Sequence, residues 1–155
     1  MKRYAAVSML FVSPATAQEF NLLRDDAFGY EIPIPAAYEL SLRPEAGNSR
    51  LYHNPQGDIL AVWAGDVGAS GFREAVRQRM RRDEDEGWDI TYERITADWA
   101  SYSGIQADQI RYLRAIRYCG DRMAYFLVDY ALSQKERYDP IVTHMVRRLR
   151  PSGSC

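Results

Sequence analysis

Hydrophobic and polar residues alternate along the first half of the chain, a pattern that is typical of short β-strands. Runs rich in β-branched and aromatic residues lie at 28–34, 38–42, 50–53 and 59–64, and the later runs are separated by Pro, Gly, Asn and Asp. Such separators favour turns, so we expect antiparallel hairpins. Pro33 and Pro35 cannot donate to a β-ladder, which places the first run at a sheet edge or where the chain leaves the sheet.

A helical period begins after residue 70. Phe72, Val76 and Met80 recur every four residues, and Gly87 is placed to end a helix, so the spacing predicts a helix over about 71–86. The apolar side chains share one side of this helix. The opposite face carries a row of three arginines, Arg73, Arg77 and Arg81.

Strand patterns return after residue 88, at 89–94, 99–103, 107–118 and 123–133. The last two runs form the clearest hairpin, because the residues between them, CGDR at 119–122, supply a turn. Alternate residues of the final run share one apolar face, which we expect to meet the core. They are Ala124, Phe126, Val128, Tyr130 and Leu132.

The last predicted element is a helix over about 140–149. Asp139 can cap it, and Pro140 suits the first helical position because its missing N–H would be unpaired there. Its apolar stripe consists of Ile141, Val142, Met145, Val146 and Leu149. A short flexible tail follows from residue 151. This order predicts one α+β domain over residues 18–155, a twisted and mainly antiparallel sheet flanked by two helices.

The N-terminus has the pattern of a secretory signal peptide. Lys2 and Arg3 precede a mostly apolar run at 4–12, and the small-residue sequence Ala15-Thr16-Ala17 follows. We expect cleavage between Ala17 and Gln18 and a periplasmic or secreted protein, with an uncleaved anchor as the alternative. The apolar run is much shorter than the roughly 20 residues that span a bilayer, so no stable membrane insertion is expected after cleavage.

Charge and cysteine content sharpen this expectation. The chain has 20 basic and 21 acidic residues, a balance that argues against nucleic acid as a partner. Its two cysteines are Cys119 and Cys155. In an oxidising compartment a pair of cysteines favours a disulfide, here between the hairpin turn and the tail. Two free thiols, or a bridge between two chains, are the alternatives.

Catalytic and metal-binding patterns are sparse. The two histidines, His53 and His144, stand alone, and no motif for a cofactor, a metal or a nucleophile is present. The acidic run at 83–86 can serve acid–base chemistry, but consecutive helical residues point in different directions. We therefore expect a solvated helix end paired with arginines at 79, 81 and 82, no cofactor, and no enzyme activity.

Two surfaces are candidates for contact with a partner. The first is the arginine row of the 71–86 helix, because Arg73 and Arg77 have no acidic residue four positions on, whereas Arg81 has Asp85. The second is an open sheet surface near Trp99 and Tyr102. The arginines at 111, 114 and 117 alternate between the faces of one strand, and pairing with acidic residues such as Asp129 is expected there.

The order of these features resembles a known family. The opening strand reads FGYEIP at 28–33, paired strands surround YSG at 102–104, and YDPIV at 138–142 leads a helix that ends RLRP at 148–151. In this the chain resembles small exported alphaproteobacterial proteins of unassigned function and, more distantly, the PsbP/DcrB-like group. The resemblance implies an antiparallel sheet flanked by helices, and a binding or assembly role without a catalytic signature.

The sequence thus favours an accessory or binding protein that acts through its surface on another envelope component. Two other classes stay open. One is a carrier of a small apolar ligand held by the tyrosines and tryptophans, and the other is a hydrolase that uses carboxylates. An enclosed apolar pocket indicates the former, and a cleft with converging titratable groups indicates the latter.

Overall fold

The computed structural model describes residues 17–42 and 48–155, so the predicted export signal lies outside the described residues except for its last position. Within that part of the chain, no helix has the length and apolarity needed to cross a bilayer. Helix α1 is Phe72–Asp85 and helix α2 is Lys135–Arg148. The strands are β1 Phe20–Asp25, β2 Tyr30–Pro35, β3 Glu39–Leu42, β4 Ser49–His53, β5 Ile59–Asp66, β6 Asp89–Ile95, β7 Trp99–Gln106, β8 Gln109–Tyr118, β9 Arg122–Ala131 and β10 Arg150–Pro151.

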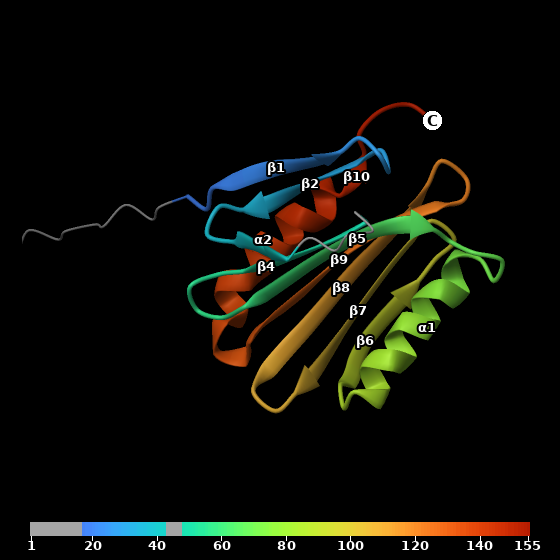
Figure 1. The fold of residues 1–155 in the computed structure, drawn as a ribbon. Coiled ribbons are helices and arrows are strands. Elements are labelled where there is room, and N and C mark those ends of the chain that lie inside the picture. Colours follow the sequence, from blue (N-terminus) through green and yellow to red (C-terminus); the bar gives the residue numbers. More distant parts are fainter. Residues whose placement is uncertain (1–16, 43–47) are drawn as a thin grey trace, which may run out of the picture.

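The strands form two antiparallel sheets. The large sheet has the order β3-β4-β5-β9-β8-β7-β6, and the small sheet has the order β1-β2-β10. Helix α1 carries the chain from β5, in the middle of the large sheet, to β6 at its edge, and the remaining strands return to pair β9 with β5. Figure 1 shows the small sheet together with α2, and α1 beside β6.

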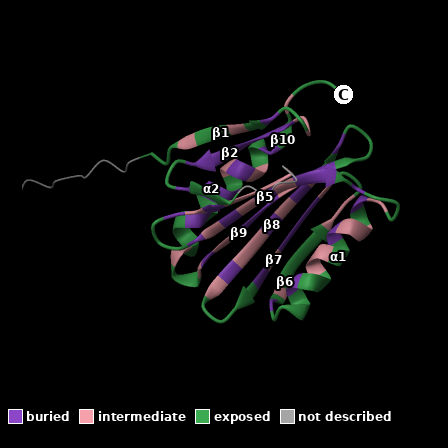
Figure 2. Cartoon of the chain, viewed as in Figure 1, coloured by how far each residue is buried: buried purple, intermediate pink, exposed green. Residues whose placement is uncertain are grey.

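A hydrophobic core lies against each face of the large sheet, and β9 contributes side chains to both cores. Phe126 and Val128 pack in the cluster that contains β2 and α2, whereas Met123 and Leu127 pack in the cluster beneath α1. Figure 2 shows the buried positions running through the central strands. The prediction for one face of this strand is confirmed from residue 124 to 130. It is wrong for Leu132, which opens a 3₁₀ turn and is 44% exposed.

Helix α1 follows its hydrophobic period closely. Gly71 precedes it and Gly87 follows it, both with positive φ. Phe72 and Val76 are buried, while Arg73 and Arg77 are exposed. The prediction of a helix over 71–86 is therefore confirmed.

Helix α2 begins earlier than predicted. It starts at Lys135 after the 3₁₀ turn, so Pro140 lies inside the helix and Asp139 does not cap it. The reason is tertiary: Tyr138, in the turn before Pro140, is buried, stacks on Tyr130 with ring centroids 4.2 Å apart, and donates to Asp58 at 2.6 Å. These contacts fix the extra turn against the sheet and override the local preference of proline.

The strand with the two prolines is not an edge strand. β2 lies between β1, which was not predicted, and β10. The backbone N–H of Ala36 donates to the carbonyl of Glu19 on the β1 side, and the N–H groups of Ile34 and Ile32 point to the same side because they alternate along a strand. The backbone nitrogens of Pro33 and Pro35 therefore point to the opposite side, where β10 lies. On that side β10 pairs only with Tyr30 and Glu31. The nitrogens of both prolines therefore lie where β2 has no neighbouring strand to receive a hydrogen bond, which explains how a middle strand tolerates them.

The tail is anchored rather than free. Arg150 and Pro151 form β10 on β2, and Ser152 donates to the carbonyl of Gly29 at 3.0 Å. A disulfide joins Cys155 to Cys119 in the β8–β9 turn, as predicted. The C-terminus is thereby fastened both to the small sheet and to the large one.

Candidate functional site

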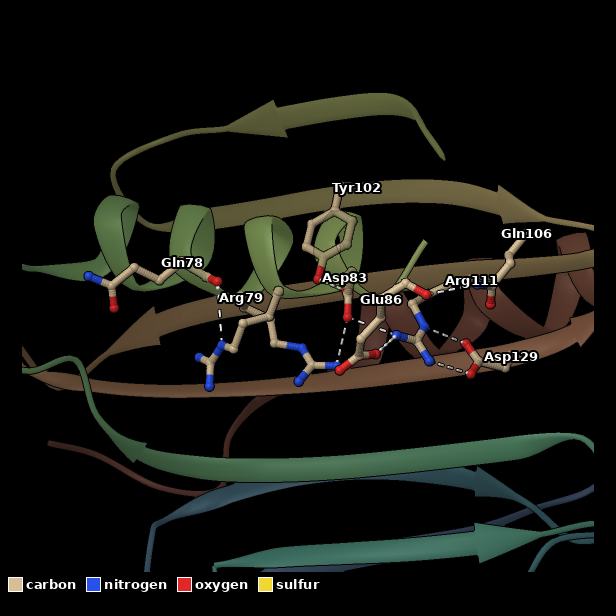
Figure 3. A network of polar contacts seen from close by, with 9 residues as sticks. Gln78, Arg79, Asp83, Glu86, Tyr102, Gln106, Arg111 and Asp129 are labelled. Carbon is tan, nitrogen blue, oxygen red and sulfur yellow. Dashed lines mark hydrogen bonds and ion pairs between the residues drawn. The ribbon is translucent and has the colours of Figure 1, made fainter. Parts of the chain in front are cut away.

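A buried ion network lies between α1 and the large sheet (Figure 3). Asp83 is completely buried, and its carboxylate accepts hydrogen bonds from Arg79 at 2.9 Å, from Arg111 at 2.7 Å and from the Tyr102 hydroxyl. Asp83 follows Val76 by seven residues and therefore shares its helix face. The expectation that all of 83–86 forms a solvated helix end is thus wrong at Asp83. The seven-residue spacing from Val76 already indicated that Asp83 lies on the buried face.

Arg111 connects this network to the next strand. Two hydrogen bonds of 2.8 and 2.7 Å join it to Asp129, its cross-strand neighbour, which confirms the predicted pairing. Its guanidinium also lies 4.2 Å from the ring centroid of Trp88. Burial works to lower the pKa of Arg111, but the hydrogen bonds and charges of Asp129 and Asp83 outweigh it and raise the pKa.

The network holds α1 in place rather than offering reactive groups. Its carboxylates, the fully buried Asp83 and the half-buried Asp129, form ion pairs with the guanidiniums of Arg79 and Arg111. Burial, together with the adjacent Asp83, raises the pKa of Tyr102, which keeps that hydroxyl protonated. Both carboxylates and the Tyr102 hydroxyl are thus engaged within the network.

The opposite face of the large sheet has an uncovered region. Helix α2 packs over β2 and β9, and its side chains reach as far as Tyr112 on β8. From Tyr112 outward, five side chains of β6, β7 and β8 are exposed or half-buried. We call them the Trp99 surface: Tyr92, Arg94, Trp99, Tyr112 and Arg114.

Arg114 is the unusual member of this surface. Its guanidinium lies 4.2 Å from the Trp99 ring centroid and donates to the Ser101 hydroxyl at 3.2 Å. In the described part of the chain no carboxylate forms an ion pair with it, and its Nε is buried without a hydrogen bond. Burial accordingly lowers the pKa of Arg114. The positive charge is held in place but not compensated.

The neighbours of Arg114 add charge and hydrogen-bonding groups but no anion. Arg94 approaches the same indole, at 5.2 Å from its ring centroid. The Tyr112 hydroxyl donates to Ser101 at 3.0 Å, so Ser101 fixes both Tyr112 and Arg114 from beneath. The result is an aromatic surface with two guanidiniums on a rigid sheet.

The structure separates the two residues predicted for the open sheet surface. Trp99 is half-buried and lies at its centre. Tyr102 is fully buried on the other face, under α1, so its prediction as a surface contact is wrong. Residues three apart in a strand point to opposite faces, and this spacing was visible in the sequence.

The predicted arginine row is a solvated helix face. Arg73 and Arg77 are exposed and make no ion pair with any residue that the structure describes. Arg81 pairs with Glu74, about two helical turns before it, and not with Asp85 as predicted. Water can solvate these charges, so this face carries no uncompensated buried group.

Metal ligands do not converge in the part of the chain at 17–42 and 48–155, where no cluster of three or more His, Cys, Asp or Glu could hold an ion. The two histidines have neighbours of another kind. His144 stacks on Phe20 with centroids 4.2 Å apart, and His53 Nδ1 lies 2.6 Å from the Ser41 hydroxyl.

Comparison with known proteins identifies the fold. Neither a family model nor a curated protein matches the sequence. Among solved structures, the Ran-binding protein Mog1p of Saccharomyces cerevisiae aligns with a TM-score of 0.64 at 11% identity, covering 88% of this chain and 97% of that one. The cyanobacterial PsbP (CyanoP) of Synechocystis sp. PCC 6803 aligns with a TM-score of 0.66 at 10% identity, covering 94% and 98%. The sequence predicted the α+β class, antiparallel strands and two helices, although it predicted one sheet where the structure has two. The chain therefore has the Mog1p/PsbP-like α+β fold.

Proposed function

We propose that this protein is an exported accessory protein that binds an acidic segment of another envelope component through the Trp99 surface. The observation that carries the proposal is Arg114, a half-buried guanidinium without a carboxylate partner in the described chain. A carboxylate from a partner would complete its hydrogen bonding. The two structural neighbours share the fold, and what they bind is not carried over to this chain.

An acidic partner gains more binding energy at Arg114 than at the exposed arginine row. A hydrogen bond between charged groups contributes about 1.5–3 kcal/mol. Folding has already removed much of the water around Arg114, so a partner gains this interaction with little further desolvation. Arg73 and Arg77 are exposed, and a contact there resembles an exposed ion pair, which contributes about 0–1 kcal/mol.

The side-chain types on this surface are those that dominate protein interfaces. Trp, Tyr and Arg supply most binding hot spots, because they offer large contact areas together with a polar group. Trp99 is flanked by the guanidiniums of Arg94 and Arg114, and Ser101 holds Tyr112 and Arg114. A surface that is already rigid loses little conformational entropy on binding.

The envelope location rests on two further observations. The N-terminal sequence has the pattern of an export signal, and the Cys119–Cys155 bond is of the kind that persists in oxidising compartments. Mass spectrometry of the exported protein is expected to give a chain that begins at Gln18. We favour binding over hydrolysis because the carboxylates of the network, Asp83 and Asp129, are held in ion pairs with arginines.

The proposal is tested by site-specific photocrosslinking in intact cells. A benzophenone amino acid at position 92, where Tyr92 is 48% exposed, is expected to give a discrete adduct that Arg114→Gln abolishes and Arg114→Lys partly retains. The matched control carries the crosslinker at Arg77 on the far side of the molecule. An adduct that forms only from position 77, or one that is indifferent to Arg114→Gln, refutes the assignment of the surface.

A further inference from the structure

A groove of about 260 Å³ lies beside α1, on the face of the large sheet opposite the Trp99 surface. Its lining includes apolar side chains such as Val76, Leu113 and Met123. Trp63 and Tyr125 form an aromatic wall, and Arg79 and Arg82 of α1 form the rim. We call it the α1 groove. Its volume lies just below the range of about 300–1,000 Å³ that suits drug-sized ligands.

The aromatic wall is shaped by a glycine. Trp63 and Tyr125 are cross-strand partners on β5 and β9, with ring centroids 5.4 Å apart and planes 28° apart. Gly65 lies on the same face two residues after Trp63, and a Cβ there would come within 2.7 Å of the indole. The indole therefore lies along the sheet only because position 65 has no side chain.

The rim of the groove is positively charged. Arg79 uses one terminal nitrogen for Asp83, while its Nε is buried without a hydrogen bond. Arg82, one helical turn later, has a long contact of 3.4 Å with the Gln78 carbonyl and no ion pair within the described residues. Asp83 is shared between Arg79 and Arg111, so the uncompensated charge of the rim is that of Arg82. One acidic residue, Asp66 at the end of β5, also lines the groove.

We propose that the α1 groove binds a small aromatic carboxylate. The ring lies against Trp63, where a flat aromatic face offers stacking, and the carboxylate lies at Arg82 and Arg79, where guanidiniums match its geometry. A neutral apolar ligand would leave Arg82 without an anionic partner, and a long lipid chain exceeds the volume. This site is separate from the Trp99 surface and does not depend on the function proposed for it.

The test is an NMR titration of the purified protein with indole-3-acetate. Two matched probes separate the contributions: indole-3-acetamide keeps the ring without the charge, and hexanoate keeps the charge without the ring. Indole-3-acetate is expected to shift the indole N–H of Trp63 and the amide of Gly65 in a saturable way. Each matched probe is expected to bind at least about tenfold more weakly, the effect of losing one charged hydrogen bond or one ring contact.

Variants decide between a specific site and general attraction. Arg82→Gln is expected to weaken indole-3-acetate about tenfold and to leave indole-3-acetamide unchanged. Gly65→Ala pushes the indole into the groove and is expected to weaken both. The control Arg73→Gln removes the same charge from the exposed side of α1 and is expected to change neither. Equal binding of acid and amide, shifts that map outside the groove, or an equal loss in Arg73→Gln overturns the proposal.

Discussion

Replacing Asp83 by Asn tests whether the buried ion network holds α1 to the sheet. Asn keeps the shape of the side chain but removes the charge that faces Arg79 and Arg111. Breaking a buried ion pair on one side typically costs about 3–5 kcal/mol. We expect the lower end, about 3 kcal/mol, because Arg111 retains Asp129 and because Arg79, with a side chain 27% exposed, can turn toward solvent.

The assay is urea unfolding followed by tryptophan fluorescence, with the disulfide intact. Trp88 lies on Arg111 and therefore reports on this region directly. With slopes of about 1–3 kcal/mol per molar urea, the expected loss lowers the unfolding midpoint by at least about 1 M. Asp85→Asn, which removes the same charge from an exposed position of α1, is the control. A midpoint for Asp83→Asn that coincides with that of the control refutes the reasoning.

Three further outcomes are expected. Arg114→Met removes an uncompensated charge, so it leaves the free energy of unfolding unchanged or raises it by up to about 1 kcal/mol. Thermal unfolding measures this, and a clear loss of stability contradicts it. Cys155→Ser costs up to about 3–4 kcal/mol in the chain-entropy model, measured by the same melts, and unaltered stability would show that the crosslink contributes nothing. Hydrogen bonds from Arg24 and Arg150 lower the pKa of Glu31 below its usual 4.5, so the stability that they give is present above pH 4.5 and is lost as the pH falls through the lowered pKa. Glu31→Gln should therefore reduce the loss of melting temperature at acidic pH, and an unchanged loss argues against this role.

Two arginines on one strand illustrate the difference between a compensated and an uncompensated charge. Arg111 and Arg114 are three residues apart on β8, so they point to opposite faces of the sheet. Arg111 meets two carboxylates and fastens α1. Arg114 meets an indole and a hydroxyl group and keeps its charge uncompensated. Proteins commonly accept such a cost in stability where a surface serves binding.

The sequence predicted the elements whose signals are local. The four-residue period of α1, the β8–β9 hairpin and the antiparallel α+β class follow from side-chain spacing and turn chemistry, and these predictions are confirmed. Cysteine content and the export pattern likewise predicted the Cys119–Cys155 bond. The burial of Asp83 and the opposite faces of Trp99 and Tyr102 were also encoded in spacing, although the acidic run and the neighbouring aromatic residues suggested otherwise.

Tertiary structure alone decided which faces are covered and which charges are compensated. Asp83 meets Arg111 only because α1 crosses from β5 to the edge of the sheet, and Tyr138 extends α2 past Pro140 only because Asp58 lies opposite it. β1 and β10 form strands because β2 is there to pair with them. Spacing along a chain fixes which side chains share a face, but whether that face meets another layer or water depends on contacts between distant residues. That is why the sequence pointed to Trp99, and only the fold revealed the uncompensated Arg114 beside it.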